Sequence, residues 1–67
     1  MKTINTYQRK GFVINHVRYD EPTLGGHYAI EVTYNDLELI SIDGLSLDAS
    51  IEAFNEEVKS LNRQVGD

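Results

Sequence analysis

The most regular hydrophobic pattern lies in the last third of the chain. Apolar residues recur there at alternating intervals of four and three, at Leu47, Ile51, Phe54, Val58, Leu61 and Val65. At 100° per residue these positions fall within an arc of about 80°, which predicts an amphipathic helix with a narrow apolar stripe. Ser46 is the expected N-cap, with Asp48 as the competing cap, and Gly66 is the expected stop.

Period-two alternation precedes this helix and predicts β-strands. The clearest strand is 27–34, where the apolar and aromatic residues of one face are Tyr28, Ile30, Val32 and Tyr34. The segment 12–19 is rich in β-branched and aromatic residues and also favours a strand, as does 37–42. Residues 3–8 could add a short first strand, an alternative that the pattern leaves open.

Turn signals separate the predicted strands. The cluster 20–26 holds Pro22 and two glycines and predicts a loop. Asn35 and Asp36 predict a two-residue hairpin turn, because both tolerate left-handed backbone conformations. Asp43 and Gly44 predict the end of strand 37–42.

These elements predict one small α+β domain over residues 1–67. It consists of an antiparallel sheet of three to four strands with one C-terminal helix packed on one face, in the order ββ(β)βα. Either Leu37 and Leu39 or Ile40 and Ile42 would point toward the helix, since both pairs are apolar. One helix covers only one face of the sheet. Some apolar strand surface is then left over, and a second subunit is its simplest cover, which predicts a homodimer.

Composition limits how so short a chain is stabilised and where it works. Cysteine is absent from the 67 residues, so neither a disulfide nor a thiolate zinc site can form. No apolar run approaches the roughly 18 residues of a membrane span, and the first residues lack the apolar region of a signal peptide. The sequence therefore predicts a cytoplasmic protein without a membrane partner.

Charge is divided unevenly along the chain. The net charge is −5, yet residues 1–19 hold four Lys or Arg and no acid, whereas residues 20–58 hold ten carboxylates and no Lys or Arg. A basic strand paired with acidic strands is one explanation of this division. A negative face that docks a basic partner is the other. Direct binding of nucleic acid is disfavoured by the excess of anions.

No pattern of catalytic or cofactor-binding residues is visible, so we expect neither an enzyme nor a cofactor. The carboxylates fall at solvated positions, whereas general acid–base catalysis needs a carboxyl in a pocket. His16 and His27 flank the predicted loop and could meet across a hairpin, with Asp20 or Glu21 as a third metal ligand; the alternative is two hydrogen-bonded or surface histidines. Because no zinc spacing is present, no metal site is predicted.

The function that fits these observations is that of a small acidic protein-binding module. Phage- and mobile-element-type inhibitors that present a negative, nucleic-acid-mimicking surface to a basic protein form one such class. The alternative is a structural or regulatory homodimer whose acidity serves solubility only. The residues expected to bind the partner are Glu31, Asp36, Glu38, Asp43, Glu52 and Glu56.

Overall fold

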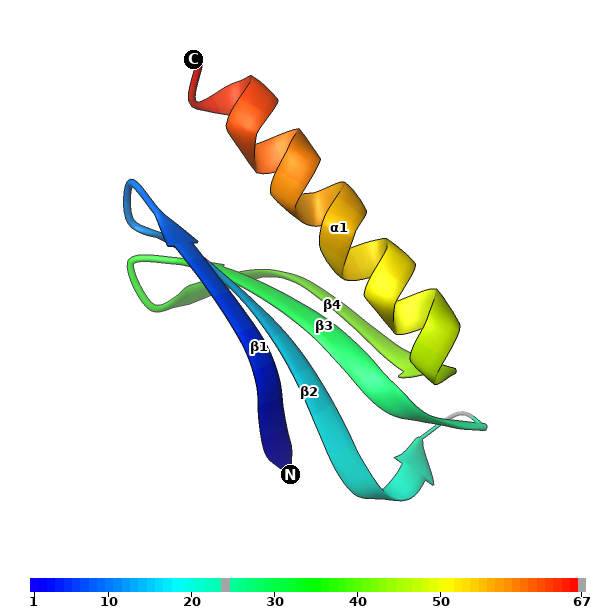
Figure 1. Ribbon diagram of the computed structural model, residues 1–67. Helices are drawn as coiled ribbons and strands as arrows, with labels where there is room; N and C mark the ends of the chain where they lie inside the picture. Colours follow the sequence, from blue (N-terminus) through cyan, green and yellow to red (C-terminus); the bar gives the residue numbers. More distant parts are fainter. Residues whose placement is uncertain (24, 67) are drawn as a thin grey trace.

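The computed structural model describes residues 1–23 and 25–66, and these form four strands followed by one helix (Figure 1). The elements are β1 (Lys2–Arg9), β2 (Phe12–Thr23), β3 (Gly26–Tyr34), β4 (Leu37–Leu45) and α1 (Leu47–Gln64). Each strand pairs antiparallel with the next, so the sheet order is β1-β2-β3-β4. The predicted α+β architecture is confirmed, and the segment 3–8 that the pattern left open belongs to strand β1.

Two tight hairpin turns set the strand pairing. Lys10 and Gly11 join β1 to β2 with φ values of 50° and 85°, and Asn35 and Asp36 join β3 to β4 with φ values of 49° and 69°. Two-residue turns with positive φ at both positions match the right-handed twist of the flanking strands. The hairpin turn predicted at Asn35 and Asp36 is therefore confirmed.

Two predicted breaks in the strands are wrong. Strand β2 continues through Pro22 to Thr23, which pairs with Gly26, so the predicted loop 20–26 is shorter than expected; Leu24 lies outside the described residues. The pairing of β2 with β3 is irregular between Arg18 and Thr23, where proline is tolerated because no ladder bond is needed. Strand β4 likewise continues past Gly44, whose φ of 73° fits a β-bulge in the ladder.

The helix begins where the sequence predicted. Ser46 is the N-cap, and its Oγ accepts a hydrogen bond from the backbone N–H of Ala49 at 3.2 Å. The helix ends at Gln64, and Gly66 follows with a φ of 69°, a conformation that glycine adopts without strain. The predicted N-cap and stop are both confirmed.

Helix α1 lies across one side of the sheet, which we call the helix-facing side; the other side is the open face (Figure 1). The core between helix and sheet consists of Ile14, Ile30, Val32 and Leu61. The ladder pairs Ile14 with Val32 and His16 with Ile30, so alternate residues of β2 and β3 point toward the helix. The face predicted for strand 27–34 is therefore the one the helix covers.

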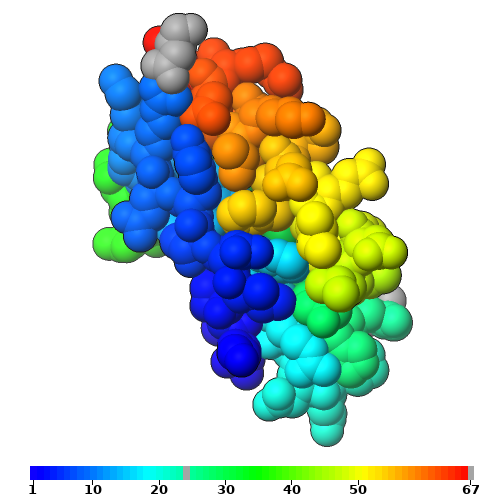
Figure 2. Space-filling model, viewed as in Figure 1, coloured from blue at the N-terminus to red at the C-terminus, as the bar shows by residue number. Residues whose placement is uncertain are grey.

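A polar contact fixes the end of the helix to the first strand. Asn62 Oδ1 accepts hydrogen bonds from the Tyr7 hydroxyl at 3.0 Å and from Arg9 Nη1 at 2.7 Å. In the space-filling view the C-terminal half of α1, in orange, lies directly against β1, in blue (Figure 2). The flank of α1 that carries Asn62 is therefore the flank that faces β1.

Candidate functional site

Three of the six carboxylates predicted to bind a partner lie on the open face of the sheet. The ladder register places Glu31 and Glu38 there, because their pairing partners alternate with the core residues. Asp43 follows the helix-facing Ile42 and points to the same side. The structure thus brings carboxylates of two neighbouring strands to one side of the sheet.

Tyr19 lies close enough to these carboxylates to feel their charge. It alternates with the helix-facing residues Ile14 and His16 of β2 and so points to the open face. Burial raises the pKa of the Tyr19 phenol, and the negative charges of Glu31, Asp43 and Glu38 raise it further, because they oppose a phenolate. We call Tyr19, Glu31, Glu38 and Asp43 the open-face cluster.

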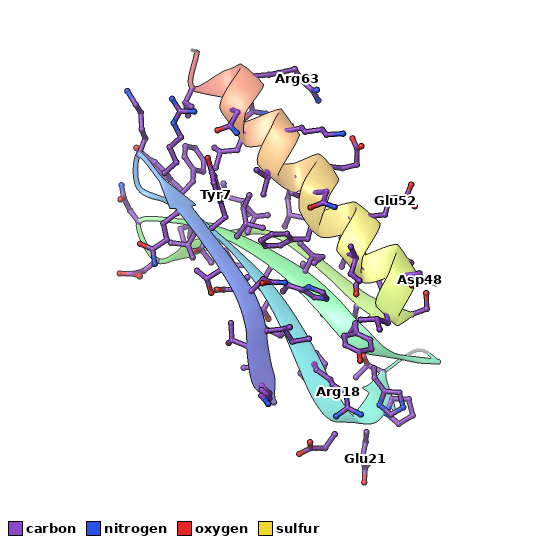
Figure 3. The ribbon with its side chains drawn as sticks, in the orientation of Figure 1. Tyr7, Arg18, Glu21, Asp48, Glu52 and Arg63 are labelled. Atoms are coloured by element: carbon purple, nitrogen blue, oxygen red, sulfur yellow. The ribbon has the colours of Figure 1, made fainter. Side chains whose placement is uncertain are left out.

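The other three predicted residues lie elsewhere. Asp36 occupies the turn between β3 and β4. Glu52 points away from the sheet on the outer side of α1 (Figure 3), and Glu56, four residues further along the helix, is also exposed. Glu56 makes an exposed ion pair with Lys59, with an N–O separation of 3.7 Å. The structure therefore does not place the helix carboxylates on the surface that holds the open-face cluster.

Three of the four cations in residues 1–19 do not face this cluster. Lys2 pairs with Arg18, and Arg9 pairs with Phe12, so all three basic residues alternate to the helix-facing side. The Arg18 guanidinium lies over the Tyr28 ring, 6.0 Å from its centroid. The strand that carries Arg18 pairs with the strand that carries Glu31, but this register turns Lys2, Arg9 and Arg18 to the side of the sheet opposite the open-face cluster.

His16 is buried in the core rather than at a site. Its side chain is 1% exposed, and its Nε2 lies 2.7 Å from Ser50 Oγ, which donates its own proton to the carbonyl of Leu47 at 2.7 Å. Ser50 Oγ therefore accepts from His16 Nε2–H, and Nδ1 is the unprotonated nitrogen. Among the described residues this Nδ1 has no hydrogen-bond partner, and burial lowers the His16 pKa. The His16–Ser50 pair is buried and links strand β2 to helix α1.

The two histidines do not meet across the hairpin. His16 faces the helix, whereas His27 Nδ1 donates to the carbonyl of Tyr19 at 3.3 Å. Among residues 1–23 and 25–66, no group of three or more histidines and carboxylates is close enough to hold a metal ion. The alternative of a metal site built with Asp20 or Glu21 therefore has no geometric basis in these residues.

Strand β4 carries an exposed apolar surface that the charge-based prediction of site residues missed. Leu37, Leu39, Ile40 and Ile42 are between 37% and 66% exposed. Next to them a pocket of about 280 Å³ opens between the C-terminal half of α1 and the strands β2 to β4. The sequence did indicate this surface, because both faces of 37–42 are apolar and one helix covers only one face. It did not indicate which of these residues would be exposed.

Comparison with known proteins gives no match to a family model, a curated protein or a solved structure. Within the described part of the chain, no helix has the length and apolar character needed to cross a membrane. Any functional assignment consequently depends on the site geometry itself.

Proposed function

We propose that this protein is a non-catalytic binding module that docks a basic protein partner on the open face of its sheet. The observation that carries the proposal is the strand register, which turns Glu31, Glu38 and Asp43 to one side of the sheet, where their charges act on Tyr19. The proposed activity is that of a cytoplasmic inhibitor, which occupies a basic groove by presenting carboxylates where nucleic acid would present phosphates.

Electrostatics supports this use of the open-face cluster. Grouped like charges speed association with an oppositely charged partner, and the rate falls as salt screens the field. Residues 20–58 supply no Lys or Arg that could neutralise the cluster from within the segment. The half-buried Tyr19 adds an aromatic side chain of the kind that often contributes strongly to binding at the centre of an interface.

Two charge reversals test the proposal against a matched control. The double variant Glu31→Lys with Asp43→Lys alters the open face, and Glu52→Lys with Glu56→Lys alters the outer side of the helix by the same net charge. The probe is a fluorescent decalysine peptide, and its affinity is measured by polarisation from low to high salt. We expect the open-face variant to lose affinity by about tenfold or more, and the helix variant to lose much less.

Equal losses in the two double variants would refute the proposal, because net charge alone would then explain binding. Circular dichroism of both variants checks that the fold is intact. A pull-down from the native host, analysed by mass spectrometry, then identifies the natural partner.

A structural or regulatory homodimer is the second proposal, and the exposed apolar side chains of β4 favour it. In that case Leu37, Leu39, Ile40 and Ile42 pack against a second copy, and the acidity serves solubility only. Light scattering across the micromolar range tests it. A monomer mass at every concentration contradicts the homodimer.

A further inference from the structure

Helix α1 is too narrow to cover the whole helix-facing side of the sheet. Strands about 4.8 Å apart make a four-stranded sheet about 19 Å wide, and one helix covers about 10 Å of that width. The core residues under α1 come from β2 and β3, as Ile14, Ile30 and Val32. The uncovered width is therefore divided between the two edge strands, β1 and β4.

The two edges differ in chemistry. On the β1 side, Asn62 of α1 binds Tyr7 and Arg9, so polar contacts close that flank. Glu57 lies about 140° from Asn62 around the helix, and it lines the pocket beside β4. On that side the sheet presents exposed apolar residues, with Leu39 and Ile40 in the pocket wall. We call this strip the β4 groove; it is formed by Leu37, Leu39, Ile40, Ile42, Glu57, Ser60 and Gln64.

The pocket of the β4 groove has room for large apolar side chains. Its volume is about 280 Å³, and its floor includes the core residues Ile14, Val32 and Leu61. A dry cavity of about 150 Å³ lined by similar residues accommodates a benzene ring. One or two leucine-sized side chains of a partner would therefore fill the pocket and shield core residues from water.

Charge selects a basic occupant. Among the residues that the structure describes, Glu57 is the one ionisable residue that lines the pocket. A second copy that docked its own α1 here would bring the exposed carboxylates Glu52 and Glu56 toward Glu57, so charge opposes a helix of this chain in the groove. Lys or Arg flanking an apolar stripe is the complementary chemistry.

The shape favours a helix over an added strand. The pairing of β3 with β4 is irregular between Val32 and Thr33 and again between Tyr28 and Ile30, so bulges interrupt β4 at two places. Bulges deform an edge strand and disfavour its pairing with another chain. An amphipathic helix instead lays its apolar face into a hydrophobic groove, and the exposed Ile40 together with the pocket beside Glu57 offers one.

We propose that the β4 groove is a docking site for a basic amphipathic helix of a partner protein. Apolar side chains of that helix fill the pocket beside Leu39 and Ile40, and a Lys or Arg on its flank pairs with Glu57. The groove lies on the opposite side of the sheet from the open-face cluster. The inference therefore goes beyond the proposed function and does not depend on it.

Two synthetic helices of about 18 residues serve as probes, long enough to form helix in water. Both have the same leucine stripe, and the polar positions are all Lys in one and all Glu in the other. Fluorescence polarisation measures the affinity of each labelled peptide. We expect the Lys peptide to bind at least about tenfold more tightly than the Glu peptide.

Matched variants locate the binding. Ile40→Ser removes an apolar side chain from the groove, and Ile51→Ser removes one of similar exposure (39% against 44%) from the flank of α1 that faces β1. Glu57→Gln removes the pocket carboxylate, and Glu52→Gln removes a carboxylate from the outer side of the same helix (Figure 3). We expect Ile40→Ser and Glu57→Gln each to lower the affinity for the Lys peptide by about tenfold. Both control variants should bind the Lys peptide with nearly the affinity of the parent protein.

Backbone amide shifts separate this inference from the proposed function. Shifts at Leu39, Ile40, Glu57, Ser60 and Gln64 on addition of the Lys peptide support the groove. Shifts confined to Glu31 and Asp43 place the peptide on the open face and overturn the inference while leaving the proposed function intact. Equal affinity of the Lys and Glu peptides for the protein overturns the inference. A parent protein that is dimeric and becomes monomeric with Ile40→Ser also overturns it, because a second copy then covers the groove.

Discussion

His16 Nε2 lies 2.7 Å from Ser50 Oγ, and this buried hydrogen bond joins strand β2 to the first turns of α1. Both side chains are almost fully buried, at 1% and 0% exposure. The rings of Tyr28 and Phe54 lie beside the imidazole, with centroids 5.8 and 5.9 Å away. The polar pair is therefore enclosed by aromatic side chains, and its loss exposes a buried donor to an apolar environment.

Ser50→Ala should destabilise the protein by about 1–3 kcal/mol, because it leaves His16 Nε2–H buried without an acceptor. Urea denaturation followed by circular dichroism measures the free energy of unfolding. Ser41→Ala is the control, since Ser41 is exposed in β4, and it should change the free energy by less than about 0.5 kcal/mol. Equal effects of the two substitutions would contradict a stabilising role for the His16–Ser50 pair.

The protein should lose stability as pH falls below about 6.5, the ordinary pKa of histidine in an unfolded chain. Burial lowers the His16 pKa in the folded state, so the unfolded state binds more protons in this range. The contribution of neutral His16 is complete above about pH 6.5 and declines as pH falls toward the lower folded-state pKa.

Urea midpoints between pH 7.5 and 5.5 test this dependence, with His27→Gln as the control that should retain it. A nitrogen-detected NMR titration provides a readout that does not require a variant. The His16 ring should remain neutral at a pH where a solvated histidine is protonated. A His16 ring that protonates near pH 6.5 contradicts the prediction.

Leu61→Ala should cost about 2–5 kcal/mol, because Leu61 is the fully packed residue of the helical stripe, at 5% exposure. That loss is comparable to the whole stability of about 3–5 kcal/mol expected of so small a core. Ile51→Ala, in the same stripe but 44% exposed, should cost much less. Thermal melts of both variants compare them, and similar midpoints would show that the helix does not pack as described.

Tyr19 should ionise above pH 10, the ordinary value for tyrosine, because burial and then the carboxylates of Glu31, Asp43 and Glu38 raise its pKa. Selective ¹³Cζ labelling and NMR follow its titration. Glu31→Gln combined with Asp43→Asn should lower the Tyr19 pKa, whereas Glu52→Gln on the helix should leave it unchanged. If the Tyr19 pKa is the same in the two variants, Glu31 and Asp43 are further from Tyr19 than the structure indicates.

Local pattern determined the secondary structure of this protein. The 4-3 spacing from Leu47 to Val65 specified the helix, and Ser46 and Gly66 marked its ends, because capping and amphipathicity depend on residues within one or two turns. Alternation in 27–34 likewise specified β3 and its buried face. The turn at Asn35 and Asp36 followed from their tolerance of positive φ.

The boundaries of β2 and β4 were predicted less well, because a break in pairing does not always end a strand. Pro22 and Gly44 are turn signals in isolation. In the sheet, the irregular pairing after Arg18 accommodates the proline, and a bulge accommodates the glycine, so both strands continue. Whether a strand continues depends on its hydrogen bonds to a neighbouring strand, and these long-range contacts cannot be predicted from the local residue types.

Only the tertiary structure decided which carboxylates share a surface. The sequence indicated an acidic segment and grouped Glu52 and Glu56 with Glu31, but the helix lies on the side of the sheet opposite the open face (Figure 1). Strand register, fixed by tight turns and shifted by bulges, brought Glu31, Glu38 and Asp43 to Tyr19. The same register turned Ile40 and Ile42 toward the helix-facing side, where one helix is too narrow to cover a four-stranded sheet.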